Sequence, residues 1–170
     1  SDPSAVTISG SVEMPGFSYG LALDGDHAYV ANSEYGLKIM DISDPASPTM
    51  VGSLQTPDNA YSLAVDGRYA YIADGESGLQ VVDISDPTDL SLAGSLDPGY
   101  VHDVEIVGDF VYAAGFTGGL YIIDIRDPAS PELMNSVDTE KAHAQLGLSK
   151  GALSAYLGAT NYSTDGYRDR

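Results

Sequence analysis

One ten-residue pattern recurs three times in this chain and limits what the chain can fold into. The copies begin 42 and 41 residues apart: 36–45 (GLKIMDISDP), 78–87 (GLQVVDISDP) and 119–128 (GLYIIDIRDP). In the second copy, Leu79 and Val81 form one alternate row of a strand, and Val82 and Ile84 form the other. Both rows are apolar, so both faces of the strand need to be covered. The Asp-Pro pair then predicts a sharp stop, because proline fixes φ for a turn and aspartate can bond back to the turn backbone.

Each copy lies in a longer unit that repeats the same order of strands. In the first unit, a short alternating strand at 19–23 is followed by the Asp24-Gly25 pair and by a second strand at 27–31. An Asp-Gly pair supplies the positive φ that a tight hairpin needs. After the Asp-Pro stop comes an outer strand around 50–54. The sequence therefore predicts one antiparallel four-stranded meander per repeat.

The repeats divide the chain, which we treat as a single domain over residues 1–170. Three repeats are complete: 16–57, 58–98 and 99–138. Residues 1–15 match the end of a repeat whose beginning is missing, and we expect them to supply a closing outer strand. Residues 139–170 read as a degenerate last repeat and a tail, because they contain neither a GLxxxDI strand nor an Asp-Pro pair.

Four-stranded repeats of about 40 residues are typical of β-propeller blades. We therefore predict an all-β fold, a β-propeller of four-stranded antiparallel blades with about four repeats of 41–42 residues. Closure within one chain is favoured, because the opening strand matches the strand that the last repeat lacks. Two alternatives are an excised part of a larger ring and pairing of the terminal strand with another subunit. Tyr29, Tyr71 and Tyr112 share one repeat position and are expected to pack between blades.

The core GLxVVDISDP, with a preceding AYVAxxxxGL, resembles the LVIVD-repeat family of propellers, which is named for this third strand. The resemblance spans residues 2 to about 138 and fails beyond about residue 159. It implies the propeller fold. Because that family is largely found in secreted and surface proteins, it also implies an extracellular or cell-surface location.

Composition narrows the range of partners. The chain has 7 Lys and Arg against 25 Asp and Glu, a formal net charge of −18. Such a surface repels phosphate backbones and anionic lipid heads, so we expect no nucleic-acid partner and no binding to a membrane surface. No apolar run is long enough to predict membrane insertion. The chain has no cysteine, which excludes disulfides and thiolate metal sites and fits export in a prokaryote.

The loops before the first strand and between the second and third strands are the predicted ligand site, because in propellers both open on one face around the channel mouth. Aromatic, amide and carboxylate side chains there can stack on sugars or grip a partner loop. The first set of loops supplies Phe17, Tyr19, Asn59, Tyr61, Tyr100, His102 and His143. The second set supplies Asn32, Glu34, Tyr35, Asp74, Glu76, Phe116 and Thr117. The alternative is that all of these are ordinary solvated loop tips.

Two short acidic loops are weak candidates for Ca²⁺, which prefers oxygen ligands. They carry Asp24 and Asp26 in one loop and Asp74 and Glu76 in the other, without the spacing of an EF-hand. An Asp-Gly hairpin accounts for Asp24 without an ion. Ca²⁺ is therefore retained as a candidate ligand, and no other cofactor is expected.

The aspartates of the repeated DISDP and DIRDP motifs also resemble metal ligands at first. Asp41, Asp83 and Asp124 are each followed by turn amides, so we interpret them as locks for the turn. We assign no catalytic residue. His102 and Asp103 are neighbours in a strand and face opposite ways, and no nucleophile elbow, phosphate loop or metal-binding His pair is present.

These features predict a non-enzymatic extracellular or cell-surface binding and assembly module. It would present a loop-lined propeller face to protein or glycan partners and could self-assemble through its terminal strands. The alternative is a channel-mouth enzyme, a hydrolase-like propeller assisted by calcium.

Overall fold

The computed structural model describes residues 7–116 and 118–134 of the chain. The chain divides into two compact units, Ser1–Leu133 and Met134–Arg170, and the fold below is that of the first unit. The predicted last repeat, His143 within it, and Thr117 lie outside the described residues.

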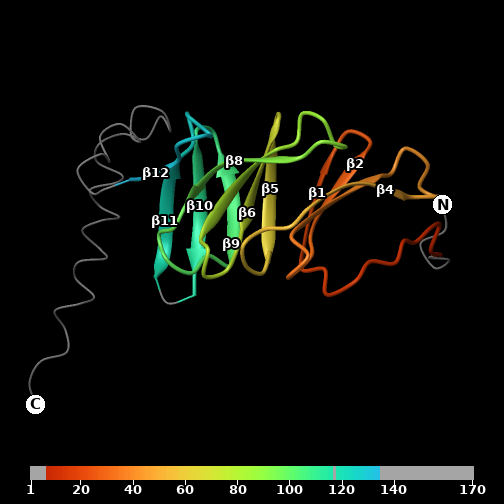
Figure 1. Cartoon of the computed structure of the whole chain (residues 1–170), viewed down its shortest axis with the longest axis horizontal. Helices are drawn as coiled ribbons and strands as arrows, with labels where there is room; N and C mark the ends of the chain where they lie inside the picture. The colour runs from red at the N-terminus through yellow and green to blue at the C-terminus, as the bar shows by residue number, and fades with distance from the viewer. Residues whose placement is uncertain (1–6, 117, 135–170) are drawn as a thin grey trace, which may run out of the picture. The chain divides into compact units, whose positions relative to one another are not determined.

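The described residues form three four-stranded antiparallel sheets, each built from four consecutive strands (Figure 1). The first contains β1 (Gly20–Asp24), β2 (His27–Ala31), β3 (Leu37–Asp41) and β4 (Thr49–Leu54). The second contains β5 (Ser62–Asp66), β6 (Tyr69–Ala73), β7 (Leu79–Asp83) and β8 (Ser91–Leu96). The third contains β9 (Asp103–Val107), β10 (Phe110–Gly115), β11 (Gly119–Asp124) and β12 (Glu132–Leu133). The all-β prediction and the meander of each complete repeat are confirmed, and we call these sheets the first, second and third blades.

The first two blades have the same strand order and the same pairing register between strands. Ala28 pairs with Met40 in the first blade, as Ala70 pairs with Val82 in the second. The outer strands β4 and β8 each contain a bulge at the same place. It lies opposite Ile39 and Met40 of β3 in the first blade and opposite Val81 and Val82 of β7 in the second. The β1–β2 hairpin turns through Gly25 with a φ of 54°, which is the positive φ that the sequence predicted.

Two apolar clusters lie between consecutive blades, and β7 contributes to both. Leu79 and Val81 pack in the cluster shared with the third blade, whereas Val82 and Ile84 pack in the cluster shared with the first. All four are at most 4 % exposed. A strand with two apolar rows is thus covered on both faces, as predicted. Because β1, β5 and β9 lie side by side in that order, the blades stack as consecutive propeller blades do (Figure 1).

The outward faces of the two end blades are less covered, and in the described residues the blades do not close into a ring. Leu21 in β1 is 64 % exposed, whereas Leu63 at the same position of the second blade is 6 % exposed. Leu120 in β11 is 58 % exposed, whereas its equivalent Leu79 is fully buried. Tyr29 and Tyr71 pack between blades, as expected from the sequence. Tyr112 is only half-buried.

The expected closing outer strand stays a prediction, because the last repeat that it would pair with lies outside the described residues. Residues 7–15 are in no strand. Even so, a Cβ added at Gly10 would lie 2.4 Å from the carbonyl oxygen of Pro45, and one at Gly52 would lie 2.1 Å from that of Pro87. Residue 10 therefore approaches the Asp-Pro turn of the first blade as an outer strand approaches the turn of the next blade. Among the described residues, no strand pairs with this segment.

The first aspartate of each DISDP or DIRDP motif locks its turn, which confirms the structural interpretation of these residues. Its carboxylate accepts a hydrogen bond from the backbone N–H two positions on: Asp41 from Ser43 at 2.9 Å, Asp83 from Ser85 at 3.0 Å, and Asp124 from Arg126 at 3.1 Å. The carboxylate groups of Asp83 and Asp124 also accept hydrogen bonds from the guanidinium groups of Arg68 and Arg126.

Candidate functional site

Six aromatic rings form a continuous row at the ends of the three blades where the loops before β1, β5 and β9 gather. The centroid distances are 6.4 Å for Phe17–Tyr19, 5.4 Å for Tyr19–Tyr61, 5.9 Å for Tyr61–Tyr100, 5.1 Å for Tyr61–His102 and 5.9 Å for Tyr100–Phe116. We call these six residues the aromatic row. All six lie in the loops predicted for the site, and the fold brings them together.

Backbone hydrogen bonds place the middle of the row. The N–H of Tyr19 donates to the carbonyl oxygen of Ala31 at 2.9 Å, which continues the ladder between β1 and β2 one residue beyond the strand. Tyr61 donates to Ala73 at 2.9 Å in the same way, and His102 donates to Ala114 at 2.8 Å. Tyr19, Tyr61 and His102, which share one repeat position, are therefore held at the same point just before the first strand of each blade. Because the first strands of the blades are neighbours, the rings at that position approach one another.

Short backbone bridges also tie each blade to the next beside the row. Ser33 and Ala60 exchange two N–H to carbonyl hydrogen bonds of 3.2 and 3.1 Å. Gly75 and Val101 exchange two of 3.1 and 2.9 Å. Phe116 has the repeat position of Ser33 and Gly75 in the third blade, and there a ring replaces a small residue. The loops that carry the row are thus fixed to each other as well as to their own blades.

Much of the row faces solvent. Phe17 is 69 % exposed, Tyr19 57 % and Phe116 80 %, while His102 is exposed and Tyr61 and Tyr100 are half-buried. Isolated exposed apolar side chains are ordinary, whereas a contiguous set marks a surface that binds something. The row is therefore a candidate binding surface.

Carboxylates adjoin the middle of the row. A hydrogen bond with Tyr61, burial, and the nearby carboxylates of Asp58 and Glu76 raise the pKa of Tyr100 to about 12. Asp58 was not among the residues predicted for the site, because Gly16 and Gly99 stand at its repeat position in the other blades. Glu76, whose N–H donates to Asp58 Oδ2 at 2.8 Å, is one of the residues predicted for the site.

Two other predicted site residues, Asn32 and Asp74, point inward and do not face a ligand. Both are fully buried. The Nδ2 of Asn32 donates to Ser18 Oγ at 3.1 Å, and the N–H of Asp58 donates to Asp74 Oδ2 at 3.0 Å. Burial raises the pKa of Asp74, and the charge of Asp58 adds to this effect. Both side chains brace the loops beneath the row.

The remaining predicted residues lie at the border of the site or outside it. Glu34 and Glu76 are exposed loop residues. Tyr35 is 37 % exposed and has no ring contact with the aromatic row among the described residues, although Lys38 Nζ lies 5.7 Å from its ring centroid. The four weak calcium candidates are split between two places, since Asp24 and Asp26 lie at the β1–β2 hairpin and the other two lie after β6. Within the described residues, no three His, Asp or Glu side chains are placed to share a metal ion.

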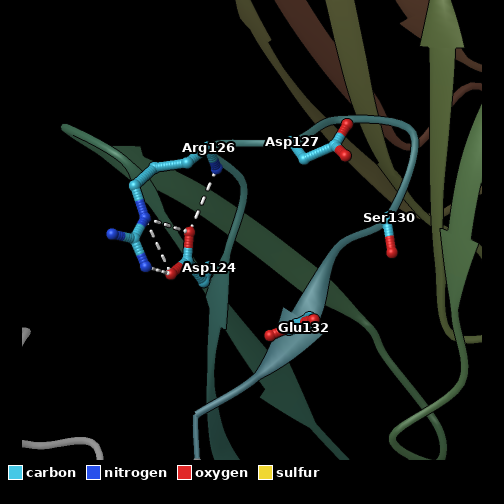
Figure 2. A pocket seen from close by; sticks show the side chains of 5 residues that line it. All are labelled: Asp124, Arg126, Asp127, Ser130 and Glu132. Atoms are coloured by element: carbon cyan, nitrogen blue, oxygen red, sulfur yellow. Dashed lines mark hydrogen bonds and ion pairs between the residues drawn. The ribbon is translucent and has the colours of Figure 1, made fainter.

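A hollow of about 330 Å³ that the sequence did not predict lies beside the DIRDP turn of the third blade (Figure 2). Asp124, Arg126, Asp127, Ser130 and Glu132 line it. Figure 2 shows the Arg126 guanidinium held by Asp124, and the N–H of Ser130 donates to the Asp127 carbonyl at 3.0 Å. This turn differs from the DISDP turns of the first two blades by Arg126, which replaces Ser43 and Ser85. Because the cation and the turn groups bond to one another, we assign no ligand here.

Among solved structures, the chain is similar to two computationally designed proteins. It matches the Ika4 protein with a TM-score of 0.61 and 11 % identity, over 77 % of this chain and 78 % of that one. It matches the Ika8 protein with a TM-score of 0.56 and 12 % identity, over 69 % of this chain. The match spans only 35 % of the Ika8 chain. At such identities the likeness concerns the fold alone.

No curated protein matches the chain. Among the described residues, no helix is long and apolar enough to cross a membrane. Three consecutive segments, 15–56, 57–97 and 98–139, match the LVIVD repeat, and their limits differ by at most one residue from the three complete repeats predicted above. The chain belongs to the LVIVD repeat family.

Proposed function

We propose that this chain is a non-enzymatic binding and assembly module that works outside the cell or at the surface of a prokaryotic cell. Its aromatic row would bind a protein or glycan partner. The observation that carries the proposal is the row itself, in which six rings from three blades are in continuous contact and three are more than half exposed. The location rests on the family resemblance and on the acidic, cysteine-free composition.

The energetics of the row support binding. Aromatic side chains bury large areas when a partner covers them, and they recur among the residues that dominate binding energy at interfaces. The ladder hydrogen bonds of Tyr19, Tyr61 and His102 fix the backbone of the row before any partner arrives. A preformed surface loses little conformational freedom on association, so more of the contact energy remains as affinity.

No observation of the described residues favours the enzymatic alternative. A channel-mouth hydrolase needs an acid, a base or a nucleophile that converge on one point. His102 stacks on Tyr61 at an interplanar angle of 23°, and Asp103 accepts a hydrogen bond from Ser62 Oγ at 2.6 Å. The two polar neighbours thus have separate structural partners.

The proposed function is tested by removing the exposed rings from the row. The double variant Tyr19→Ala/Phe116→Ala truncates two side chains that make little contact with the core, so it should keep the fold. Wild type and variant are applied to peptide and glycan arrays, with Met50→Ala/Leu92→Ala as the control. Met50 and Leu92 are 54 % and 50 % exposed on the outer strands.

We expect wild type and control to bind a shared set of ligands and the row variant to lose them by about ten-fold or more, the effect of one strong hot spot. Circular dichroism would verify that all three proteins keep their β-structure. Ligands that the row variant retains at full affinity would contradict the proposal, as would a wild type that binds nothing on either array.

A further inference from the structure

The loops that carry the aromatic row, together with their neighbours at the same ends of the blades, contain acidic residues and no Lys or Arg. We call them the mouth loops, and they are 16–19, 32–36, 55–61, 74–78, 97–102 and 115–119. Their acidic residues are Glu34, Asp58, Asp74, Glu76 and Asp97. The charged side chains of these loops other than His102 are therefore all acidic, and they attract a cation that approaches the row.

The Lys and Arg side chains of the described residues have hydrogen-bond or ion-pair partners other than the carboxylates of Asp58 and Glu76. Lys38 Nζ donates to Ser53 Oγ, on the outer strand of the first blade. Arg68 pairs with Asp83, and Arg126 pairs with Asp124, both next to Asp-Pro turns at the other end of the blades. The carboxylates of Asp58 and Glu76 accordingly have no cationic partner in the described part of the chain.

The ring geometry favours separate side chains over one flat polymer. Adjacent rings of the row are tilted by 36°, 43°, 37° and 56°, and only His102 and Tyr61 stack, at 23°. Successive ring faces therefore do not lie in one plane, as they would need to for a run of sugar rings stacked along the row. Tilted faces can each receive a different side chain.

This chain already shows how its tyrosines receive cations. Arg68 Cζ lies 5.3 Å from the ring centroid of Tyr69, and Lys38 Nζ lies 5.7 Å from that of Tyr35. A cation within about 6 Å of a ring centroid is attracted by the ring quadrupole. Tyrosine rings next to carboxylates therefore offer a cation both a π-face and an ion pair.

We propose that the aromatic row binds an extended peptide segment of a partner protein that carries Arg side chains. This inference rests on the proposed function and narrows it to one ligand class. Arg side chains of the segment stack on the faces of Tyr19, Tyr61 and Tyr100, and the carboxylates of Asp58 and Glu76 pair with the guanidinium groups. An extended backbone suits a row that crosses three blades.

The test uses the full chain and a short fluorescent peptide of alternating arginine and serine. Its partner peptide has citrulline, a neutral isostere, in place of each arginine. Fluorescence anisotropy gives Kd at low and at high salt. A neutral hexasaccharide of glucose is the glycan probe, and its binding is measured by calorimetry.

Three variants locate the binding. Glu76→Gln removes one exposed carboxylate beside the row, and Asp89→Asn removes one exposed carboxylate beside an Asp-Pro turn, so the two change the net charge equally. Tyr19→Ala removes one exposed ring. We expect the arginine peptide to bind, and Glu76→Gln and Tyr19→Ala each to weaken it by about three-fold to ten-fold, the range of one cation–π contact or exposed ion pair. Asp89→Asn should leave Kd unchanged, and the citrulline peptide should bind at least about ten-fold more weakly than the arginine peptide.

Other outcomes overturn the inference in distinguishable ways. If Asp89→Asn weakens the arginine peptide as much as Glu76→Gln does, attraction to the net charge explains the binding. If the hexasaccharide binds and Tyr19→Ala weakens it while Glu76→Gln does not, the proposed function stands with a glycan as ligand. If wild type binds neither probe, the inference is wrong, and the arrays described above decide the proposed function separately.

Discussion

Asn32 and Asp74 occupy one repeat position, and the two blades use it in the same way. Each side chain is fully buried, and each leaves its Oδ1 without a hydrogen-bond partner in the described residues. The difference between them is charge. An amide tolerates this site as a neutral group, whereas an ionised carboxylate loses hydration there without an ion pair to offset the loss.

Asp74→Asn should therefore stabilise the protein at neutral pH. Burial raises the pKa of Asp74 in the folded state, so its contribution to stability is fully present below the unfolded pKa of about 4. That contribution is lost as the pH rises through the folded pKa. We expect the variant to raise the Tm by a few degrees at pH 7 and to leave it unchanged near pH 3, as measured by circular dichroism on heating.

Asn32→Asp is the matched reverse change. It should lower the Tm at pH 7 and have little effect near pH 3, by the same reasoning. A fall in the Tm of Asp74→Asn at pH 7 would contradict the prediction. If that fall appeared only in millimolar Ca²⁺, it would show that the ionised carboxylate holds the cation that the sequence raised as a candidate.

Tyr71 and Tyr112 make a second matched pair at the residue scale. Tyr71 is 2 % exposed between the second and third blades, whereas Tyr112 is half-buried. Tyr71→Ala should cost about 3–5 kcal/mol, the range for removing a large buried ring, and Tyr112→Ala should cost clearly less. Urea denaturation measures both. A cost below about half a kcal/mol for Tyr71→Ala would mean that this side chain does not pack between blades in solution.

At the scale of the element, the Asp-Pro turn is stabilised by the aspartate that precedes it. The guanidinium of Arg68 and the hydroxyl and N–H of Ser85 lower the pKa of Asp83 to about 2. A lowered folded pKa gives stability that is present above the unfolded pKa of about 4 and is lost as the pH falls toward about 2. Asp83→Asn should therefore lower the Tm at pH 7.

The difference between wild type and Asp83→Asn should shrink between pH 4 and about 2, because wild type then loses the same charge. Arg68→Gln is the control that removes the ion pair and keeps the turn lock to Ser85. It should lower the Tm less than Asp83→Asn does. An equal Tm for wild type and Asp83→Asn at neutral pH would show that the turn needs no lock.

Elements were the part of the fold that could be predicted best from the sequence. The two apolar rows of β7 required cover on both sides, and the 42-residue and 41-residue intervals between the three copies implied that neighbouring repeats provide it. The loops of the site were predicted as a set, but the direction of their side chains was not. Asn32 and Asp74 turn inward because bridges between blades leave a buried polar position beneath the loops. That depends on how neighbouring blades meet, which one repeat does not encode.

Contacts between distant side chains were also beyond the reach of the sequence. The shared position of Tyr19, Tyr61 and His102 was visible in the repeats, but their ring contacts depend on the close approach of consecutive first strands. A Cβ at Gly20 would lie 2.8 Å from the Cα of Ser62. That glycine lets the strands approach, and no periodicity of apolar residues indicates it.

At the scale of the whole molecule, a backbone contact repeats from blade to blade. Glycines in outer strands lie against the Asp-Pro turn of the following blade, with an added Cβ 2.1 Å from the Pro87 carbonyl oxygen for Gly52 and 2.3 Å from that of Pro128 for Gly94. Gly10 makes the same approach to Pro45 at 2.4 Å, although residue 10 is outside any strand. Closure by the opening segment, within the chain or between subunits, stays a prediction, and this contact provides a way to test it.

Gly52→Val should destabilise strongly, by roughly 2–3 kcal/mol, because β4 is held in the ladder by β3 and cannot retreat from the Pro87 carbonyl. Gly10→Val should cost less than half as much, since its segment has no ladder and can move away from Pro45. Urea denaturation at several protein concentrations compares the two variants. Equal costs would mean that residues around Gly10 are held by a partner strand in solution, and a dependence on concentration would place that strand in a second subunit. No cost at Gly10 would mean that the segment is not docked on the first blade.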